Sequence, residues 1–207
     1  MSPIEEAAAA ALRGELVVFP TDTVYGLATR PDDPGATDRS FEAKRRPRHL
    51  SLPILVASTE EARTVGHFDE RAERLVTLWP GALTVVVPRA PASRSWQLGD
   101  EADTVGVRVP RHPLALAVLE ASGSLAVTSA NISGGSPART CDELHAIFGD
   151  LVAVYLCQDE PLEGVASTVV DLAHGAARLV RAGALDPARI IELLGSEAPL
   201  LDSRSPR

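Results

Sequence analysis

The chain has 207 residues, of which 45% are hydrophobic and 23% are charged, and its formal net charge is -8. A chain of this length and composition buries a sizeable core, which excludes a mainly disordered protein. The negative charge argues against diffuse binding to a nucleic-acid backbone, because such binding depends on phosphate neutralisation by Lys and Arg. Any anion site must therefore be local.

The N-terminal stretch "MSPIEEAAAAALRG" is predicted to form a helix. It carries Glu5 and Glu6 where a signal peptide would carry positive charges. No apolar run reaches the roughly 18 to 20 residues that span a bilayer, so we expect a cytoplasmic protein without membrane contact. The only two cysteines, Cys141 and Cys157, argue against a disulfide framework and fit a reducing compartment.

Short β-branched runs alternate with amphipathic windows along the chain, a pattern typical of an α/β fold. We find no internal repeat or linker before residue 195, so we predict one domain over 1–195 and a flexible tail over 196–207. The expected strands are "ELVVFP" (15–20), "LPILVAS" (52–58), "LTVVVP" (83–88), "VGVRVP" (105–110), "LAVTSA" (125–130), "LVAVYL" (151–156) and "ASTVVDL" (166–172).

Helix boundaries are marked at four further places. Ser58 and Glu61 have the spacing of a capping box, and "PLALAVLEASG" (113–123) is a buried helix that Gly123 closes. Asp142 is expected to cap "ELHAIFG". A last helix begins at "DP" (186–187) and ends at a glycine, residue 195.

Two polar segments follow expected strands directly. "PTDTVYG" (20–26) is either a polar turn or a set of rigid hydroxyls beside a carboxylate that recognises a small polar substrate. "TSANISGGSP" (128–137) is either a flexible loop or a cradle in which backbone and hydroxyls approach a phosphate. Ligands of open α/β sheets gather at such strand ends.

Cations are concentrated in "KRRPR", where Lys44 and Arg46 are separated by one residue and stiffened by Pro47. This run either forms a solvated basic face or presents the Lys44 ammonium, as a point charge, and the Arg46 guanidinium, as a bidentate donor, to one polyphosphate. Arg108 lies inside the apolar run "VGVRVP", so it needs an anionic partner from the protein or from a substrate.

Several classes of enzyme are poor candidates. The five histidines and two cysteines show no metal-ligand spacing, so we expect no metal held by protein side chains. The sequence has no Gly-x-Ser-x-Gly elbow, no Walker A motif and no Gly-x-Gly-x-x-Gly fingerprint.

Taken together, seven ordered motifs resemble the YrdC-like family of threonylcarbamoyl-AMP synthases. The resemblance spans about residues 12 to 183 and implies a single-domain twisted mixed sheet with flanking helices and a concave, locally basic cavity. It also implies a nucleotidyltransferase that makes L-threonylcarbamoyladenylate and pyrophosphate from L-threonine, bicarbonate or CO2, and ATP, with Mg2+ on the phosphates. The motifs are "FPTDTVYGL", "AKRRP", "WPGALTVVV", "VGVRVP", "TSANISG", "GVASTVVD" and "RLVRAG".

The resemblance also implies a role for individual residues. The family's Lys-x-Arg and Ser-x-Asn pairs correspond to Lys44 with Arg46 and Ser129 with Asn131. The catalytic role is expected of Lys44 and Arg46. ATP would be bound by Lys44, Arg46, Thr104, Ser129, Asn131 and Arg181, and threonine by Thr23, Arg108, Thr128 and Ser167, with Arg108 pairing with the threonine carboxylate.

Some positions depart from the family pattern, and two alternatives stay open. Ala166 stands where many members have Glu, and 50–52 read Leu-Ser-Leu where many have a Pro-containing pair. The product, the first intermediate in threonylcarbamoyladenosine modification of tRNA, would pass to a tRNA threonylcarbamoyl transferase complex. The alternatives are an RNA-binding module of the same fold, with weak RNA binding by the Lys44–Arg48 cluster, and a paralogue that uses another amino acid or carbamoyl adenylate.

Overall fold

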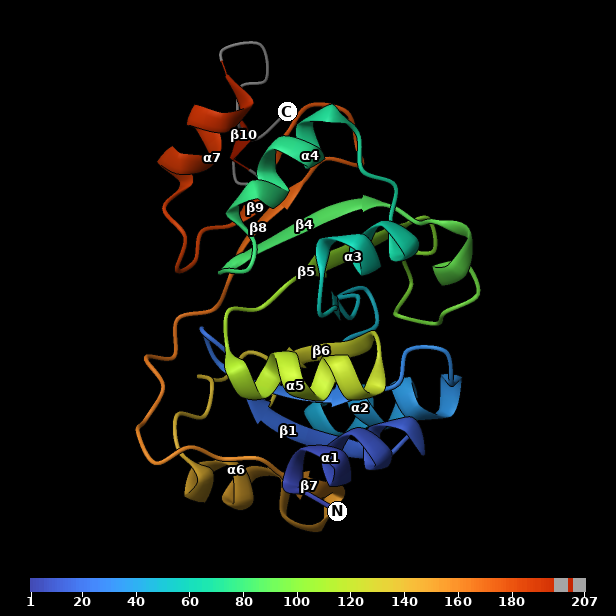
Figure 1. Cartoon of the computed structure of the whole chain (residues 1–207), viewed down its shortest axis with the longest axis vertical. Coiled ribbons are helices and arrows are strands. Elements are labelled where there is room, and N and C mark those ends of the chain that lie inside the picture. Colours follow the sequence, from blue (N-terminus) through green and yellow to red (C-terminus); the bar gives the residue numbers. More distant parts are fainter. Residues whose placement is uncertain (196–200, 203–207) are drawn as a thin grey trace.

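The computed structural model describes residues 1–195 and 201–202, and all its strands join one mixed ten-stranded sheet. The predicted α/β class with a mixed sheet and flanking helices is confirmed (Figure 1). The strand order is β10-β9-β8-β4-β5-β3-β6-β2-β1-β7. The strands are β1 Leu16–Pro20, β2 Tyr25–Thr29, β3 Ile54–Leu55, β4 Leu83–Pro88, β5 Thr104–Arg108, β6 Leu125–Ser129, β7 Val152–Tyr155, β8 Thr168–Asp171, β9 Arg178–Arg181 and β10 Leu201–Asp202.

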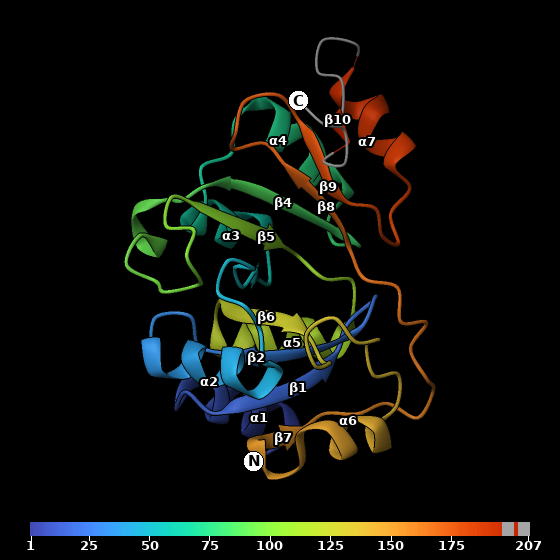
Figure 2. The ribbon, with the colours of Figure 1, turned by 180° about the vertical axis from the view of Figure 1, so that it is seen from behind.

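Helices cover the two ends of this sheet. In Figure 1, α3, α4 and α7 lie with β4, β5, β8 and β9 in the upper half, whereas α1, α2, α5 and α6 surround β1, β2, β6 and β7 in the lower half. Figure 2 shows α2 on the side of the sheet seen from behind. The helices are α1 Pro3–Leu12, α2 Pro34–Lys44, α3 Thr59–Val65, α4 Glu70–Leu75, α5 Pro113–Ser122, α6 Cys141–Phe148 and α7 Pro187–Leu194, with short 3-10 turns at Val76–Leu78, Pro91–Ser93 and Gly149–Leu151.

The core follows this division. One apolar cluster joins β4 and β5 to α3, α4 and α7, and it includes the fully buried Leu75 and Leu83. A second cluster packs α1 and α5 against β1 and β6, and a third packs α6 against the other side of β1 and β2. Such burial of β-branched and leucine side chains stabilises the sheet by roughly 1.5–3 kcal/mol for each fully buried side chain.

Most of the expected elements are observed. All seven predicted strands are present, and α1, α5 and α7 end within two residues of the predicted bounds. Ser2 and Glu5 form a capping box at the start of α1, and Asp186 caps α7. Ser58 caps α3 as predicted, although the Glu61 carboxylate accepts from the backbone of Ala57 instead of closing the box.

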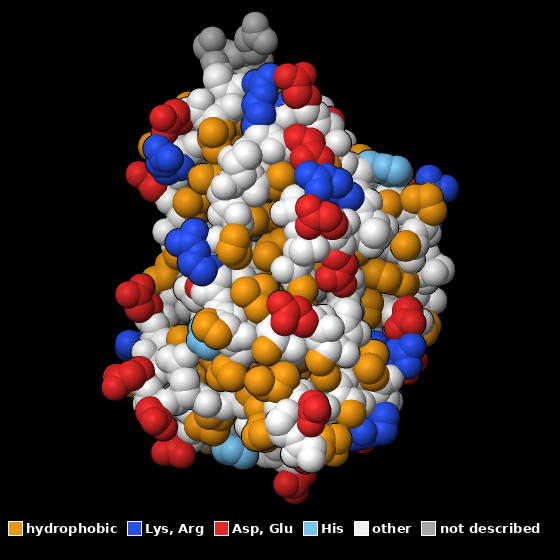
Figure 3. Space-filling model, viewed as in Figure 1, with side chains coloured by type: hydrophobic (Ala, Val, Ile, Leu, Met, Phe, Trp, Pro, Cys, Tyr) orange, Lys and Arg blue, Asp and Glu red, His pale blue; other side chains and the backbone are white. Residues whose placement is uncertain are grey.

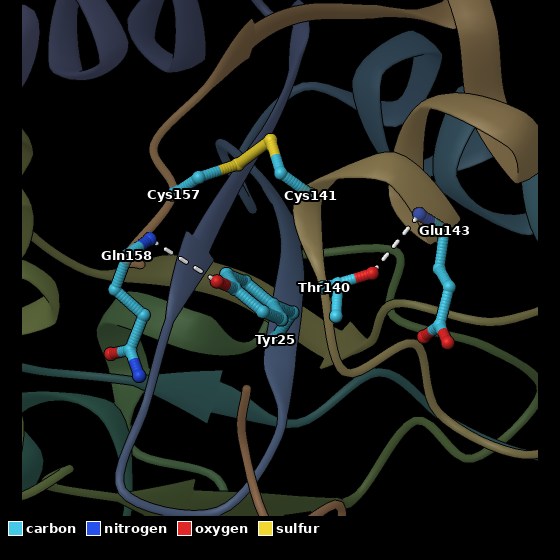
Figure 4. The surroundings of a disulfide bond; sticks show 6 residues. All are labelled: Tyr25, Thr140, Cys141, Glu143, Cys157 and Gln158. Carbon is cyan, nitrogen blue, oxygen red and sulfur yellow. Dashed lines mark hydrogen bonds between the residues drawn. A yellow bond between two sulfur atoms is a disulfide. The ribbon is translucent and has the colours of Figure 1, made fainter. Parts of the chain in front are cut away.

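The expected cap of α6 is wrong. Thr140 caps this helix by accepting a hydrogen bond from the Glu143 backbone, as Figure 4 shows. The helix begins at Cys141, two residues earlier than expected, so Asp142 lies in the first turn. There its negative charge still favours the positive end of the helix dipole.

The expectation for the cysteines is also wrong. Cys141 at the start of α6 and Cys157 after β7 form a disulfide, with a Cα–Cα distance of 5.8 Å (Figure 4). Helix α6 packs beside the end of β7, so the fold brings together two cysteines that are 16 residues apart. The cysteines therefore give no support to a reducing compartment.

The flexible tail predicted over 196–207 is described only in part. Leu201–Asp202 form β10, which pairs in parallel with the first two residues of β9 and so covers part of a strand that would otherwise be the sheet edge. Residues 196–200 and 203–207 lie outside the described part of the chain. In the described residues, no helix combines the length and hydropathy that crossing a bilayer requires.

Candidate active site

A cavity of about 100 Å³ lies across the middle of the sheet. Seven neighbouring strands, from β9 through β8, β4, β5, β3 and β6 to β2, present residues to it from their bodies or their ends. No aspartate or glutamate lines it, whereas three arginines do. The lining residues are Thr21, Val24, Gly26, Arg46, Pro53, Leu55, Thr84, Arg108, Val127, Thr128, Ser129, Ala166, Ser167 and Arg181.

Arg108, the last residue of β5, has a side chain that is only 6% exposed. Its guanidinium donates to Asp22 Oδ1 at 2.5 Å, to Thr23 Oγ1 at 2.8 Å and to the Gly81 carbonyl at 2.9 Å. Burial lowers the pKa of Arg108, and the Asp22 carboxylate opposes this shift. The anionic partner that the sequence required is thus a residue of the protein, and two of the five guanidinium hydrogens remain for a ligand in the cavity.

The turn after β1 holds Asp22 and Thr23 in place. Thr21 Oγ1 donates to the Val24 carbonyl at 2.6 Å and accepts from two backbone amides of the same turn. The sequence left two alternatives for 20–26, a polar turn and a set of rigid hydroxyls beside a carboxylate. The segment is both, because the hydrogen bonds of the turn hold the hydroxyls in place. Gly26 then allows β2 and β6 to approach closely, since a Cβ there would lie 2.6 Å from Val127.

Arg46 and Arg181 also line the cavity. Arg46 donates to the carbonyls of Leu50 and Ser51, at 2.6 and 3.1 Å. Burial lowers the pKa of Arg46 and of Arg181, and the positive charge of Arg181 lowers that of Arg46 further. Three desolvated cations that repel one another favour an anionic ligand between them.

Lys44 is not part of the cavity lining and is only 1% exposed. Its ammonium donates to the carbonyls of Ser129 and Asn131 and, at 3.3 Å, to Asn131 Oδ1. Burial, and next the charge of Arg46, lower the pKa of Lys44 to about 7. Lys44 therefore fixes the end of β6 and the loop after it.

The end of α2 separates the four cations of "KRRPR". Arg45 adopts φ of +50° and caps the helix, so the chain turns there and the Arg45 side chain is exposed. Arg48 is also exposed, pairs with Asp38 and lies 4.9 Å from the centre of the Phe41 ring. Arg45 and Arg48 therefore lie at the surface.

The loop "TSANISGGSP" is closed by its own side chains. Asn131 donates to the carbonyls of Ile132 and Gly135, both at 2.8 Å, and accepts from Ser129 Oγ at 2.6 Å. The Asn131 side chain is thus used in shaping the loop, whereas Thr128 and Ser129 line the cavity. Of the two alternatives that the sequence left for this loop, its hydrogen bonds favour the rigid cradle.

Ser167, which directly precedes β8, also lines the cavity. Arg181 donates to its carbonyl at 3.0 Å and to its hydroxyl at 3.2 Å, and Thr84 Oγ1 lies 2.9 Å from Ser167 Oγ. Gly183 allows the backbone after Arg181 to lie directly against Ala166 and Ser167, because a Cβ at Gly183 would lie 2.2 Å from the Ala166 carbonyl oxygen.

The structure brings most of the predicted site residues together. Six line the cavity, namely Arg46, Arg108, Thr128, Ser129, Ser167 and Arg181, and three contact these from behind, namely Thr23, Lys44 and Asn131. Thr104 is not brought there: it begins β5, at the opposite end from Arg108, and its carbonyl accepts from Arg89. The pairing of Asp22 with Arg108 and that of Thr84 with Ser167 were not predicted, because each joins residues more than 80 positions apart.

The charges on one face of the molecule are mixed. On the face seen in Figure 3, Lys and Arg side chains are interspersed with Asp and Glu. Within the described residues, no group of three or more His, Cys, Asp or Glu side chains could hold a metal ion. The three arginines in the cavity lining, with no acidic side chain beside them there, suit an organic or phosphate anion.

Comparisons with known proteins agree on one family. The profile of the Sua5/YciO/YrdC family, described as "Telomere recombination", matches residues 9–183. A Mycobacterium tuberculosis protein provisionally named threonylcarbamoyl-AMP synthase is 40% identical over 200 residues, which cover 96% of this chain and 92% of the relative.

Solved structures extend this similarity to the fold. Pyrococcus abyssi Sua5 complexed with L-threonine is 35% identical with a TM-score of 0.86; the match covers 96% of this chain but 58% of that one. Escherichia coli YciO is 26% identical with a TM-score of 0.82, and the match covers 89% of this chain and 90% of YciO.

Proposed function

The chain belongs to the Sua5/YciO/YrdC family, and on this basis we propose that it is a threonylcarbamoyl-AMP synthase. The reaction joins L-threonine, bicarbonate or CO2, and ATP into L-threonylcarbamoyladenylate and releases pyrophosphate. The relative complexed with L-threonine supports threonine as the amino acid. A curated Bacillus subtilis relative with this name, 35% identical over 93% of the chain, supports the activity.

The observation that carries the proposal is the charge of the cavity. Arg46, Arg108 and Arg181 line it, and Asp22, which pairs with Arg108, is not part of the lining. Both substrates of the chemical step are anions, so their mutual repulsion is a main barrier to the reaction. Fixed cations that face the place where negative charge develops lower that barrier.

The chemistry requires two steps in one pocket. The threonine amine adds to CO2 and loses a proton, which leaves an N-carboxylate. An oxygen of this N-carboxylate attacks the α-phosphorus of ATP, and the bond from that phosphorus to the pyrophosphate oxygen breaks. We assign the carboxylate of threonine to Arg108, with Thr23, Thr128 and Ser167 around the amino acid.

The nucleotide is assigned to the remaining polar residues of the same pocket in this proposal. Arg46 and Arg181 hold phosphates, and Ser129 contributes its hydroxyl. Lys44 and Asn131 act through the loop that they fix, because their polar atoms already bind Ser129 and its neighbours. We assign no role to Thr104, which lies outside the cavity lining.

Mg2+ is better matched to the phosphates of ATP than to the side chains that line the cavity. The cavity lining offers hydroxyl and guanidinium groups and no carboxylate, which is the ligand that Mg2+ prefers. We propose that Mg2+ arrives on the ATP phosphates, where it neutralises charge. The adenylate would then pass to a tRNA threonylcarbamoyl transferase complex.

Pyrophosphate release tests the proposal. The protein is incubated with ATP, Mg2+ and labelled L-threonine, with and without bicarbonate, and the same assay is run with Arg46→Ala and Arg48→Ala. We expect release that depends on both threonine and bicarbonate, is abolished in Arg46→Ala and is only weakened in Arg48→Ala, whose side chain is exposed. Salt-dependent RNA binding without pyrophosphate release would favour the RNA-binding module instead.

A further inference from the structure

Thr84 is a buried polar residue that the proposed reaction does not use. It lies on β4, is 5% exposed and lines the cavity. The register Val85↔Val107 places it beside Arg108 of β5, and Leu83↔Thr168 places it beside the segment that carries Ser167. Thr84 therefore stands between two residues assigned to threonine.

The orientation of the Thr84 side chain is fixed on both sides. Its methyl group faces Gly106, where an added Cβ would lie 3.3 Å from Thr84 Cγ2. Its hydroxyl lies 2.9 Å from Ser167 Oγ, and no other hydrogen bond of this hydroxyl is present among the described residues. Glycine on the neighbouring strand leaves room for this rotamer.

The hydrogens of the two hydroxyls can be counted. Ser167 Oγ accepts from Arg181, so it is already an acceptor. If Ser167 donates to Thr84, the Thr84 hydrogen is left over, and if Thr84 donates, the Ser167 hydrogen is left over. In either case the pair keeps one O–H donor, and both residues line the cavity.

We propose that Thr84 is a positioning residue for threonine binding: it fixes the Ser167 hydroxyl so that the pair presents one O–H to a carboxylate oxygen of the bound amino acid. The acceptor is anionic because Arg108 and Arg181 flank the pair. This inference rests on the proposed function, since it assumes that the cavity binds threonine. It adds a residue from a third strand to the side chains assigned to that substrate.

The test is calorimetric titration of L-threonine into the protein without ATP, so that binding is read independently of turnover. We expect Thr84→Val, which keeps the shape but removes the hydroxyl, to weaken binding about 3- to 10-fold. Thr84→Ser should bind within about twofold of the unchanged protein, because it keeps the O–H. Thr77→Val is the matched control: Thr77 is exposed, its hydroxyl bonds only the Arg74 carbonyl, and its loss should leave affinity unchanged.

A double-mutant cycle separates positioning from support of the fold. If Thr84 acts through Ser167, Thr84→Val combined with Ser167→Ala should bind threonine about as weakly as Ser167→Ala alone. The inference is overturned if Thr84→Val binds like the unchanged protein, if Thr84→Ser is as weak as Thr84→Val, or if the two substitutions are additive. Should Thr84→Val not fold, as circular dichroism would reveal, Thr84→Ala replaces it in the cycle. An unchanged protein that fails to bind threonine would refute the proposed function itself.

Discussion

The Asp22–Arg108 ion pair joins the first turn of the sheet to β5 inside the protein, with side chains 15% and 6% exposed. Asp22→Asn tests how much the ion pair contributes to stability, because it removes the negative charge. Asparagine keeps one oxygen for Arg108 and for the Arg111 backbone, whose N–H donates to Asp22 at 2.9 Å. Breaking a buried pair costs about 3–5 kcal/mol when one partner is lost entirely. With one acceptor oxygen retained, we expect a loss of about 2–3 kcal/mol in the free energy of unfolding, the range of a charged hydrogen bond.

The assay is urea unfolding at pH 7, supported by thermal unfolding. For a protein of this size the same loss lowers Tm by roughly 5–10 °C. Asp32→Asn is the matched control, since Asp32 pairs with Arg30 at the surface, where such pairs contribute about 0–1 kcal/mol. If Asp22→Asn and Asp32→Asn lose the same small amount of stability, the reasoning about burial is refuted.

Three further predictions concern the cavity and its surroundings. Burial lowers the pKa of Lys44 to about 7, so from about pH 7 up to its usual 10.5 the unfolded chain binds more protons than the folded one. Stability relative to Lys44→Met should therefore rise by about 2 kcal/mol from pH 7 to 9 in urea titrations, and parallel pH profiles would contradict this. Arg108→Ala should weaken threonine binding by about 1.5–3 kcal/mol in calorimetry, and an unchanged affinity would remove the role of Arg108. Unreduced, denatured protein should show no alkylated Cys141 or Cys157 by mass spectrometry, and Cys157→Ser should lower stability by about 3 kcal/mol; alkylation of both thiols without reductant would disprove the pairing.

Strand β2 shows where local sequence patterns fail for the fold. Its residues, "YGLAT", include Gly26 and an alanine, both poor strand formers, so the sequence reads as the end of a polar turn. The strand exists because β1 and β6 hydrogen-bond to it on both sides. Helix α2 was also missed: Asp33 and Pro34 mark its start, but Phe41 is its only large apolar residue.

For the candidate site, the sequence indicates which residue types need a partner but not which residues those partners are. The need of Arg108 for an anion follows from its apolar run, but the choice of Asp22, 86 residues away, depends on the folded sheet. Lys44 and Arg46 were expected to act alike on phosphates. In the structure, the turn at Arg45 directs Lys44 to the loop carbonyls and leaves Arg46 in the cavity lining, a difference that the sequence does not indicate.

The central claim is that this basic cavity is where threonine and ATP meet. A crystal structure with L-threonine and an ATP analogue that carries a methylene between its α- and β-phosphorus atoms tests it most directly. The account predicts the threonine carboxylate within hydrogen-bond distance of Arg108 and the phosphates against Arg46 and Arg181. Ligands bound elsewhere on the protein, with no density between these three arginines, would contradict it.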